Sequence, residues 1–120
     1  MEENTPPFVY RIASRDEWAR AKAVGSLIPD RFDDEGFVHL SKRNQILRPA
    51  NLLYSGQDDL LLLVIDVAKL TADLIFEPGS HGEDEHFPHL YGPLNLDAVV
   101  STIGFPCEVD GSFVLPEELR

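Results

Sequence analysis

The sequence has little cysteine and no long apolar run. Cys107 is the single cysteine in 120 residues, so an internal disulfide is excluded. Its rarity favours a reducing compartment, and we expect a cytoplasmic protein. The longest apolar run, residues 60–65, has six residues, whereas a helix that crosses a bilayer needs about 20. We therefore expect neither a membrane protein nor a disulfide-stabilised domain.

Positive charge is also scarce. The chain carries 21 Asp and Glu against 10 Lys and Arg, which gives a formal net charge of −11 at pH 7. A field of this sign repels phosphate backbones, so nucleic acids and anionic membranes are not expected as partners. A small anionic ligand remains compatible with the charge, because salt screens distant charges while donors in a cleft act at short range.

Motifs typical of several enzyme classes are absent as well. The sequence has neither a Walker loop nor a GxGxxG fingerprint. Cys107 has no activating cation nearby in the sequence, and Ser41 is better explained as a helix cap, so hydrolysis through a nucleophile is disfavoured. Residues 1–7 lack the basic and apolar parts of a secretory signal, and we expect a flexible leader there.

What the sequence does contain is the pattern of one α+β domain. Its length is that of a single domain, and 43% of its residues are hydrophobic, which is enough to form a core. A capping-box pattern at Ser14 and Glu17 predicts a helix that ends before Gly25. The predicted buried stripe of this helix is Trp18, Ala21 and Val24.

Other segments predict the strands and a second helix. Residues 60–65 show no alternation, so we expect a central strand that is covered on both faces. An amphipathic helical segment is predicted from residue 42 to 54, in which Pro49 either kinks the helix or makes a fresh one start near Arg48. Residues 26–35 are predicted to form a surface loop. The predicted strands are residues 8–12, 36–40, 60–65, 74–77 and 98–103.

The predicted strand at residues 36–40 carries the first candidate for function. Alternation directs Val38 and Leu40 to the core and places His39 on the other face, at the end of the strand. Ser41 follows and is predicted to cap the next helix. An imidazole beside a helix N-terminus suits an anionic ligand. The alternative is a core histidine whose ring is satisfied by a backbone carbonyl.

Residues 87–94 (FPHLYGPL) are a second candidate. Two prolines and a glycine predict a rigid, extended loop that holds His89 and Tyr91, so both side chains are candidates for lining a ligand site. The alternative is a packed loop in which Tyr91 covers the edge of the core. The candidate donors to an anion are Arg11, Arg43 and Arg48. Arg11 is favoured among them because it lies on a predicted strand.

A histidine cluster raises the alternative of a metal site. His81, His86 and His89 lie within nine residues, with acidic residues among them. Their spacing matches neither the i, i+4 pair of a zinc-binding helix nor a zinc knuckle. A metal site therefore stays an alternative, and we assign no residue as a metal ligand.

Five parts of the sequence stand in an order that is specific to one known family. They are residues 10–12 (YRI), Trp18, residues 36–41 (GFVHLS), residues 59–66 (DLLLLVID) and residues 87–99 (FPHLYGPLNLDAV). In these parts the chain resembles domain of unknown function family 952. The resemblance implies an ADP-ribosyltransferase-like fold, which is a single compact α+β domain with a split, mostly antiparallel β-sheet core and flanking helices. In active relatives the cleft of that core binds NAD.

The resemblance also implies roles for single residues. Arg11 falls where relatives place a strand-borne Arg or His near the adenosine ribose or phosphate, and His39 where a second strand carries a His or Tyr to NAD. The third position, a Glu in many ADP-ribosyltransferases, has no clear match. Its candidates are Tyr91, Asp97 and Glu108. The order of segments is also similar to bacterial RNA 2′-phosphotransferases, but the net charge of −11 argues against an RNA substrate.

Three hypotheses for the function result. In the first, the protein is an NAD-binding, ADP-ribosyltransferase-like enzyme that needs no covalent nucleophile. Its catalytic residues would be Arg11, His39 and Tyr91, and its NAD-binding residues would be Arg11, His39, Ser41, Phe87, His89 and Tyr91. In the second, it is a non-catalytic module that binds a nucleotide or another small molecule. In the third, it is a metal-binding protein that uses the histidine-rich loop.

Overall fold

The computed structural model describes residues 5–79 and 84–120, and its strands form two three-stranded sheets and one two-stranded pair. We name β1-β4-β8 the apolar sheet and β3-β6-β5 the histidine sheet; both are antiparallel, as is the short pair β2-β7. The helices and strands are β1 (Phe8–Ser14), α1 (Arg15–Val24), β2 (Ser26–Leu27), α2 (Phe32–Glu35), β3 (Val38–His39), α3 (Leu47–Leu53), β4 (Leu60–Asp66), β5 (Asp73–Pro78), β6 (His86–Tyr91), β7 (Leu94–Asn95) and β8 (Val99–Phe105). Short 3-10 turns are η1 (Arg43–Gln45), η2 (Val67–Lys69), η3 (Leu96–Ala98) and η4 (Glu117–Leu119).

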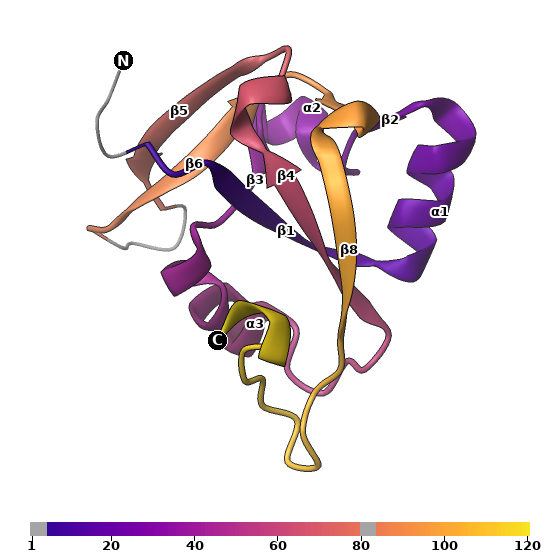
Figure 1. Ribbon diagram of the computed structural model, residues 1–120, viewed down its shortest axis with the longest axis vertical. Coiled ribbons are helices and arrows are strands. Elements are labelled where there is room, and N and C mark those ends of the chain that lie inside the picture. Colours follow the sequence, from indigo (N-terminus) through magenta and orange to yellow (C-terminus); the bar gives the residue numbers. More distant parts are fainter. Residues whose placement is uncertain (1–4, 80–83) are drawn as a thin grey trace.

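The central strand of the apolar sheet is β4, which pairs with β1 on one side and β8 on the other. This confirms the central strand predicted for residues 60–65. Leu62, Leu63 and Ile65 have no exposed surface, because both faces of the sheet are covered. Figure 1 shows β1, β4 and β8 together, with α1 to one side and α3 below.

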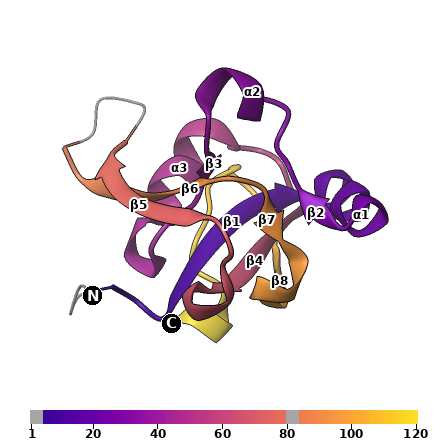
Figure 2. The same ribbon diagram turned by 90° about the horizontal axis from the view of Figure 1, so that it is seen from above.

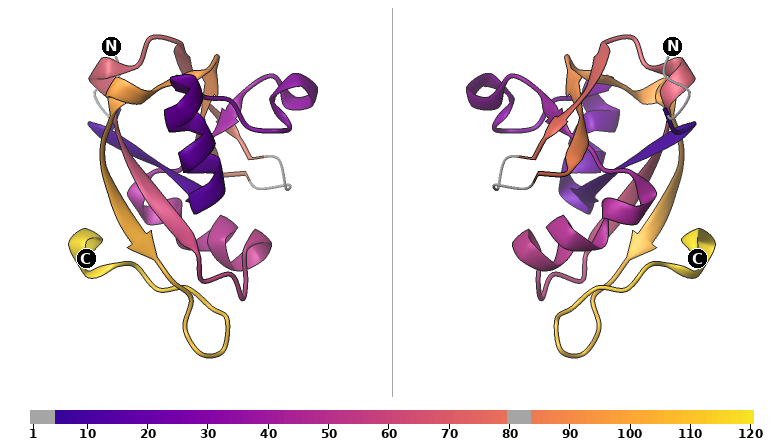
Figure 3. Two further views of the ribbon diagram at one scale, coloured as in Figure 1. Left: turned by 90° about the vertical axis from the view of Figure 1, so that its right-hand side faces the viewer. Right: turned by 90° about the vertical axis from the view of Figure 1, so that its left-hand side faces the viewer.

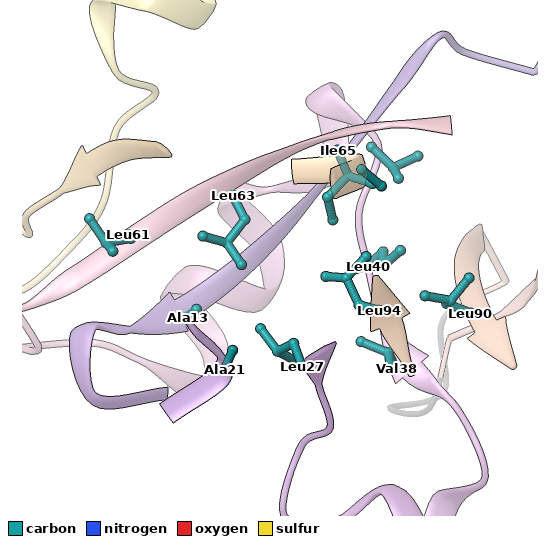
Figure 4. Close-up of a cluster of buried hydrophobic side chains, with 12 residues drawn as sticks. Ala13, Ala21, Leu27, Val38, Leu40, Leu61, Leu63, Ile65, Leu90 and Leu94 are labelled. Atoms are coloured by element: carbon teal, nitrogen blue, oxygen red, sulfur yellow. The ribbon is translucent and has the colours of Figure 1, made fainter. Parts of the chain in front are cut away.

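Two hydrophobic clusters cover the faces of the apolar sheet. The first lies between the two sheets and includes Leu63 of β4, Val38 of β3 and Leu90 of β6. Figure 4 shows this cluster in the space between β4 and the short strands. The second cluster lies on the other face and includes Leu62 of β4 and Ala50 of α3. The segment after β8 runs past the end of the sheet and turns back (Figure 3), where it adds to the second cluster.

An isolated bridge joins the two sheets. The N–H of Tyr10 in β1 donates to the carbonyl oxygen of Ser41 at 2.8 Å, and the N–H of Ser41 donates to the carbonyl oxygen of Tyr10 at 2.8 Å. Figure 2 shows that β5 and β6 cross above β1 at an angle instead of continuing its sheet. The bridge is therefore the place where the apolar sheet and the histidine sheet come together.

Helix α1 begins where the sequence predicts. The Oγ of Ser14 accepts a hydrogen bond from the N–H of Glu17 at 3.0 Å, and Gly25 ends the helix with a φ of 102°. Glu17 does not complete the predicted capping box, because its carboxylate binds the guanidinium of Arg11 instead. The first turn of α1 thus supplies a carboxylate to the neighbouring strand.

The buried face of α1 is narrower than predicted. Ala21 is buried, and Trp18 packs against the first cluster. The prediction is wrong for Val24, which is 74% exposed. Val24 is the last residue of the helix, and it lies beyond the turn that packs on the sheet.

Ser41 does not cap a helix, which corrects the prediction. Its backbone is tied to Tyr10 by the bridge, and the next residue, Lys42, is the N-cap of η1. The side-chain oxygen of Gln45 accepts a hydrogen bond from the N–H of Lys42 at 2.9 Å. Of the two alternatives for residues 42–54, the fresh helix is confirmed, because η1 ends at Gln45 and α3 begins at Leu47. Pro49 lies in the first turn of α3, where its missing N–H breaks no helical hydrogen bond.

Strand β6 replaces the rigid loop that was expected for residues 87–94, and that prediction is wrong. The carbonyl of Pro88 accepts a hydrogen bond from the N–H of Leu40 at 3.1 Å. Proline has no N–H to donate in return, so the pairing of β3 with β6 stops at His39. The chain beyond His39 is then free to bridge to β1.

The predicted surface loop of residues 26–35 contains β2 and one helical turn, α2. Leu27 is buried in the first cluster because β2 pairs with β7. Gly36 ends α2 with a φ of 82°, a conformation that glycine adopts without strain. The chain reverses there and enters β3, which brings Glu35 next to His39.

Together these elements make one compact α+β domain with a radius of gyration of 13.6 Å. In the described residues, no helix has both the length and the apolar character that are needed to cross a bilayer. Residues 1–4 of the expected leader lie outside the described residues.

Candidate functional site

A cavity of about 420 Å³ lies beside the bridge that joins the two sheets. Pockets that bind small molecules typically have volumes of about 300 to 1,000 Å³. Residues of β1, α1, α2, β3, α3 and β6 line the cavity. The predicted site residues among them are Arg11, His39, Ser41, Phe87 and His89. The fold therefore brings together most of the residues that the sequence analysis selected.

Arg11 spans the space between β1 and β3. Its Nη1 donates to the carbonyl oxygen of His39 at 3.1 Å, and its Nε and Nη2 donate to the carboxylate of Glu17 at 3.1 and 2.8 Å. The side chains of Arg11 and Glu17 are only 10% and 17% exposed. Water screens such a pair weakly, so Arg11 reaches the cavity with one carboxylate already bound.

His39 faces the cavity from β3 and is paired with Glu35. Its Nε2 lies 3.1 Å from Oε1 of Glu35, and its side chain is 39% exposed. The alternative of a core histidine is therefore wrong for His39. Burial lowers the pKa of His39 below its ordinary value of 6.5, although the hydrogen bond to Glu35 acts in the opposite direction. The ring is thus neutral near pH 7 and donates its Nε2 proton to the carboxylate.

His89 lies directly opposite His39 in the pairing of β3 with β6. Its Nδ1 is 2.7 Å from Oε2 of Glu77, and its ring stacks on Phe37 with a centroid distance of 4.0 Å and an interplanar angle of 14°. The rings of His39 and His89 meet edge to face, with their centroids 5.4 Å apart. Two imidazoles, each bound to a glutamate, therefore stand next to each other on one face of the histidine sheet.

Tyr91 is outside the cavity lining and contacts Glu77 and Phe37, the two neighbours of His89. Its hydroxyl donates to Oε2 of Glu77, and its ring centroid lies 5.4 Å from that of Phe37. The hydrogen bonds from Tyr91 and His89 hold the pKa of Glu77 below its usual range, and the bond to Glu77 raises the pKa of Tyr91. Tyr91 is 43% exposed and is not among the residues that line the cavity.

Strand alternation explains why these side chains share a face. Val38 and Leu90, which are paired between β3 and β6, point into the first cluster. Their neighbours in sequence must then point to the opposite face. The side chains on that opposite face include Phe37, His39, Glu77, Phe87, His89 and Tyr91. One sheet thus separates the core from the candidate site.

Comparison with known proteins identifies the family. The model of the family described as "Protein of unknown function (DUF952)" matches residues 12–102. The chain belongs to the DUF952 family. A search of curated proteins finds no match.

Solved structures of the protein CC0527 from Caulobacter crescentus are similar to this DUF952 protein. The crystal structure of CC0527 has 34% sequence identity and a TM-score of 0.82, over 93% of this chain and 97% of that chain. The crystal structure of a double mutant of CC0527 gives the same values. The solution NMR structure has 34% identity and a TM-score of 0.79, over 94% of this chain and 97% of that chain. The similarity therefore covers both sheets.

The pocket of the DUF952 protein contains carboxylates that the sequence analysis did not select. Glu17 fits a capping box, and Glu35 ends an acidic run, and both patterns are typical of solvated helix ends. The spacing of four between Glu35 and His39 is the one available signal. Glu77, which binds His89 but does not line the cavity, gives no local signal, because it is 12 residues from His89 in the sequence.

Other candidates lie away from the cavity. Asp97 and Glu108 are not among the residues that line it. Asp97 accepts a hydrogen bond from Nδ2 of Asn95 at 2.7 Å, and Glu108 lies in the segment after β8. Arg43 donates to the carbonyl oxygen of Leu119 at 3.2 Å. None of these three side chains lines the cavity.

The histidines considered for a metal site are divided by the fold. His81 lies outside the described residues. His86 and His89 are three residues apart on β6, so the strand directs them to opposite faces. Across residues 5–79 and 84–120, no group of three or more His, Cys, Asp and Glu side chains is placed to hold a metal ion.

Proposed function

We propose that this DUF952 protein binds NAD, or a related nucleotide, in the cavity beside the bridge and transfers ADP-ribose from it. The observation that carries the proposal is the convergence of residues from separate strands on one cavity. Arg11 comes from β1, His39 from β3 and Phe87 from β6. The family resemblance implies contacts with NAD for Arg11 and His39, and the first hypothesis adds Phe87 as a wall of the nicotinamide site.

Arg11 retains donors for a ligand in spite of its pairing. A guanidinium carries five N–H groups. The hydrogen bonds to Glu17 and His39 use three of them in the described part of the chain. The other two are available to a phosphate or ribose oxygen. Because Glu17 offsets the charge of Arg11, we assign Arg11 to the orientation of the ligand more than to its affinity.

Glu35 supplies the carboxylate for which the sequence analysis found no match. It lines the cavity, and its Oε1 is 3.1 Å from Nε2 of His39. A fixed negative charge stabilises the oxocarbenium-like ribose that forms while NAD loses nicotinamide. His39 would hydrogen-bond the same ribose. Phe87, which is 7% exposed, would provide a flat apolar wall for the nicotinamide ring.

The finer fold assignment belongs to the same proposal. We propose that the two sheets correspond to the split β-core of the ADP-ribosyltransferase-like fold. Two observations support this assignment: all strand pairs in the described residues are antiparallel, and the cavity lies beside the bridge that joins the two sheets.

A non-catalytic binding module is the second candidate function. It is favoured by the pairing of donors with carboxylates inside the pocket, namely Arg11 with Glu17 and His39 with Glu35. Such pairs fix the shape of a pocket and orient a ligand without activating a second substrate. A nucleotide would then be held and released unchanged.

Calorimetry with millimolar NAD tests the binding. We expect saturable heat with the wild type and an affinity at least about tenfold lower in His39→Ala, a loss of about 1.4 kcal/mol. The matched control is His86→Ala, an exposed histidine on the opposite face of β6, and it should bind as the wild type does. No heat with the wild type, or equal affinity in His39→Ala, contradicts NAD binding here.

A second measurement separates the two candidate functions. Free nicotinamide is quantified by chromatography after several hours of incubation with NAD. Release of nicotinamide supports the transferase, whereas binding without release supports the non-catalytic module.

A further inference from the structure

His89 is a buried polar side chain at the centre of the histidine sheet. It is 2% exposed, and Phe37 covers one face of its ring at 4.0 Å. Burial of an imidazole costs free energy unless its nitrogens find hydrogen-bond partners or water. An apolar residue at this position would stabilise the sheet more simply, so the imidazole calls for an explanation.

One nitrogen of His89 is bound, and the other is accessible beside the cavity lining. Nδ1 lies 2.7 Å from Oε2 of Glu77, and Nε2 has no hydrogen-bond partner in the described residues. In that part of the chain, no buried side-chain N or O atom is both sealed from solvent and without a partner. Nε2 is therefore not sealed from solvent, and the accessible space beside His89 is the cavity that this residue lines.

Glu77 determines which nitrogen carries the proton. An ionised carboxylate only accepts hydrogen bonds, so the neutral ring of His89 keeps its proton on Nδ1 and leaves a lone pair on Nε2. Tyr91 donates to the same oxygen of Glu77, and Phe37 stacks on the ring. The direction of the lone pair is therefore set by three neighbours. Carboxylate–imidazole pairs with this geometry serve as general bases.

We infer that Nε2 of His89 is the proton acceptor for a hydroxyl group of the second substrate. The inference rests on the proposed function and names the class of molecule that receives ADP-ribose: an alcohol, a sugar hydroxyl or water. A carboxylate or a phosphate dianion has no proton to give to Nε2 and is excluded by the same chemistry. Nothing in this role requires that His89 contribute to the affinity for NAD.

The step balances as follows. The O–H bond of the hydroxyl breaks, its proton moves to Nε2, and an oxygen lone pair forms the bond to C1 of the ribose. The C1–N bond to nicotinamide breaks, and its electron pair returns to the ring nitrogen, which neutralises the pyridinium. Glu77 stabilises the resulting imidazolium of His89 until the proton passes to solvent.

The same arrangement changes the role of Tyr91. The sequence predicts a catalytic role for Tyr91, but the hydroxyl of Tyr91 is bound to Glu77 and Tyr91 is not among the residues that line the cavity. Tyr91 is therefore a positioning residue that acts through Glu77. Glu77 is a positioning residue for His89 in the same sense.

The protonation of the ring is tested first, in the wild type and without a ligand. Long-range ¹H–¹⁵N NMR of the ¹⁵N-labelled protein, at a pH where the ring is neutral, shows which nitrogen of His89 carries the proton. We expect the proton on Nδ1 in the wild type and loss of this preference in Glu77→Ala. A proton on Nε2 in the wild type overturns the inference and leaves NAD binding in place.

Kinetics test the role itself. In His89→Gln we expect nicotinamide release at saturating NAD to fall about 100-fold, while the Kd for NAD stays within about threefold. Tyr91→Phe should lower kcat less and leave KM unchanged, and the control His86→Gln should match the wild type. Unchanged release in His89→Gln overturns the inference alone. NAD binding without release in the wild type overturns it in favour of the binding module, and no NAD binding is the separate failure of the proposed function.

Discussion

The two sheets of this DUF952 protein bury different kinds of central strand. In the apolar sheet, β4 buries five aliphatic side chains, none more than 7% exposed: Leu60, Leu61, Leu62, Leu63 and Ile65. In the histidine sheet, β6 also buries its middle, but that middle holds Pro88 and His89. The first sheet is covered by hydrophobic clusters on both faces, whereas the second has one apolar face and one face with the site.

This difference shows what each sheet depends on. An apolar core tolerates exchanges between side chains of similar volume, because hydrophobic contacts have no direction. A buried imidazole depends on one partner in one geometry, here Glu77 of β5. The hydrophobic clusters on the apolar sheet therefore set the stability of the domain, whereas the histidine sheet, together with Arg11 of β1, sets the orientation of a few polar atoms.

The largest loss of stability is expected where the two sheets meet. Arg11→Met leaves the carboxylate of Glu17, whose side chain is only 17% exposed, without its partner, and the free energy of unfolding should fall by about 4 kcal/mol. Urea unfolding followed by circular dichroism measures the change. The matched control is Arg20→Met, whose pair with Asp30 is exposed and spans 4.0 Å, and its loss should stay below about 0.5 kcal/mol. Equal losses in both variants would contradict the account of the junction.

The next prediction tests whether the stability of the hydrophobic core can be changed without a change in NAD affinity. Leu62→Ala leaves a cavity in the second cluster of the apolar sheet, and the free energy of unfolding should fall by about 3 kcal/mol. NAD affinity should not change, because Leu62 does not line the pocket. Leu52→Ala, at a leucine that is 57% exposed, should stay within about 0.5 kcal/mol of the wild type. A change of NAD affinity in Leu62→Ala would contradict the view that the second cluster affects stability alone.

A smaller effect is expected in the histidine sheet itself. Phe37→Leu removes the ring that stacks on His89, and the loss in unfolding free energy should be about 1 kcal/mol. The ring ¹⁵N signals of His89 should shift in this variant. Phe8→Leu, at an exposed phenylalanine, should leave those signals unmoved. Unshifted signals in Phe37→Leu would mean that the stack does not fix the imidazole.

The smallest effect is a dependence of stability on pH. The pKa of His39 is lowered by burial, so the folded protein binds fewer protons than the unfolded chain, in which the pKa is about 6.5. The contribution of His39 to stability is complete above that value and is lost as the pH falls towards the folded pKa. Between about pH 7.5 and 5.5, His39→Gln should therefore lose less stability than the wild type. Equal losses would show that His39 is not desolvated.

The lowered pKa values of Glu77 and Asp110 affect stability in a lower pH range than the pKa of His39 does. Hydrogen bonds from Tyr91 and Ser112 respectively are the largest causes of these shifts. Their contributions are present above the ordinary carboxyl pKa, about 4, and are lost only as the pH falls below it. Urea unfolding at pH 5.5 and above therefore isolates His39 from them.

The apolar sheet could be predicted from the sequence because its signals are local. The run of residues 60–65 lacks alternation, which is typical of a strand buried on both faces, and the structure confirms it. Ser14 and Gly25 are residue types that begin and end helices, and α1 begins and ends with them. In both cases neighbouring residues determine the structure.

The histidine sheet and its site could be predicted only in part. Alternation predicts that the side chain of His39 lies on the face of the strand away from Val38 and the core. The structure confirms this prediction. Strand β6 was not predicted, because Pro88 argues against a central strand. The missing N–H of Pro88 instead ends the pairing of β3 with β6 after His39. Glu35 and Glu77, the partners of His39 and His89, were not predicted. Pairing across strands and turns depends on tertiary structure, which local residue types do not encode.

The central claim is that the cavity beside the bridge binds NAD through β1, β3 and β6. Titration of the ¹⁵N-labelled protein with NAD, followed by backbone amide NMR, tests it most directly. We predict saturable shifts at Arg11, His39, Ser41 and Phe87, and none along the outer strand β8. No shifts, or shifts confined to β8 or to the C-terminal segment after it, would contradict the claim.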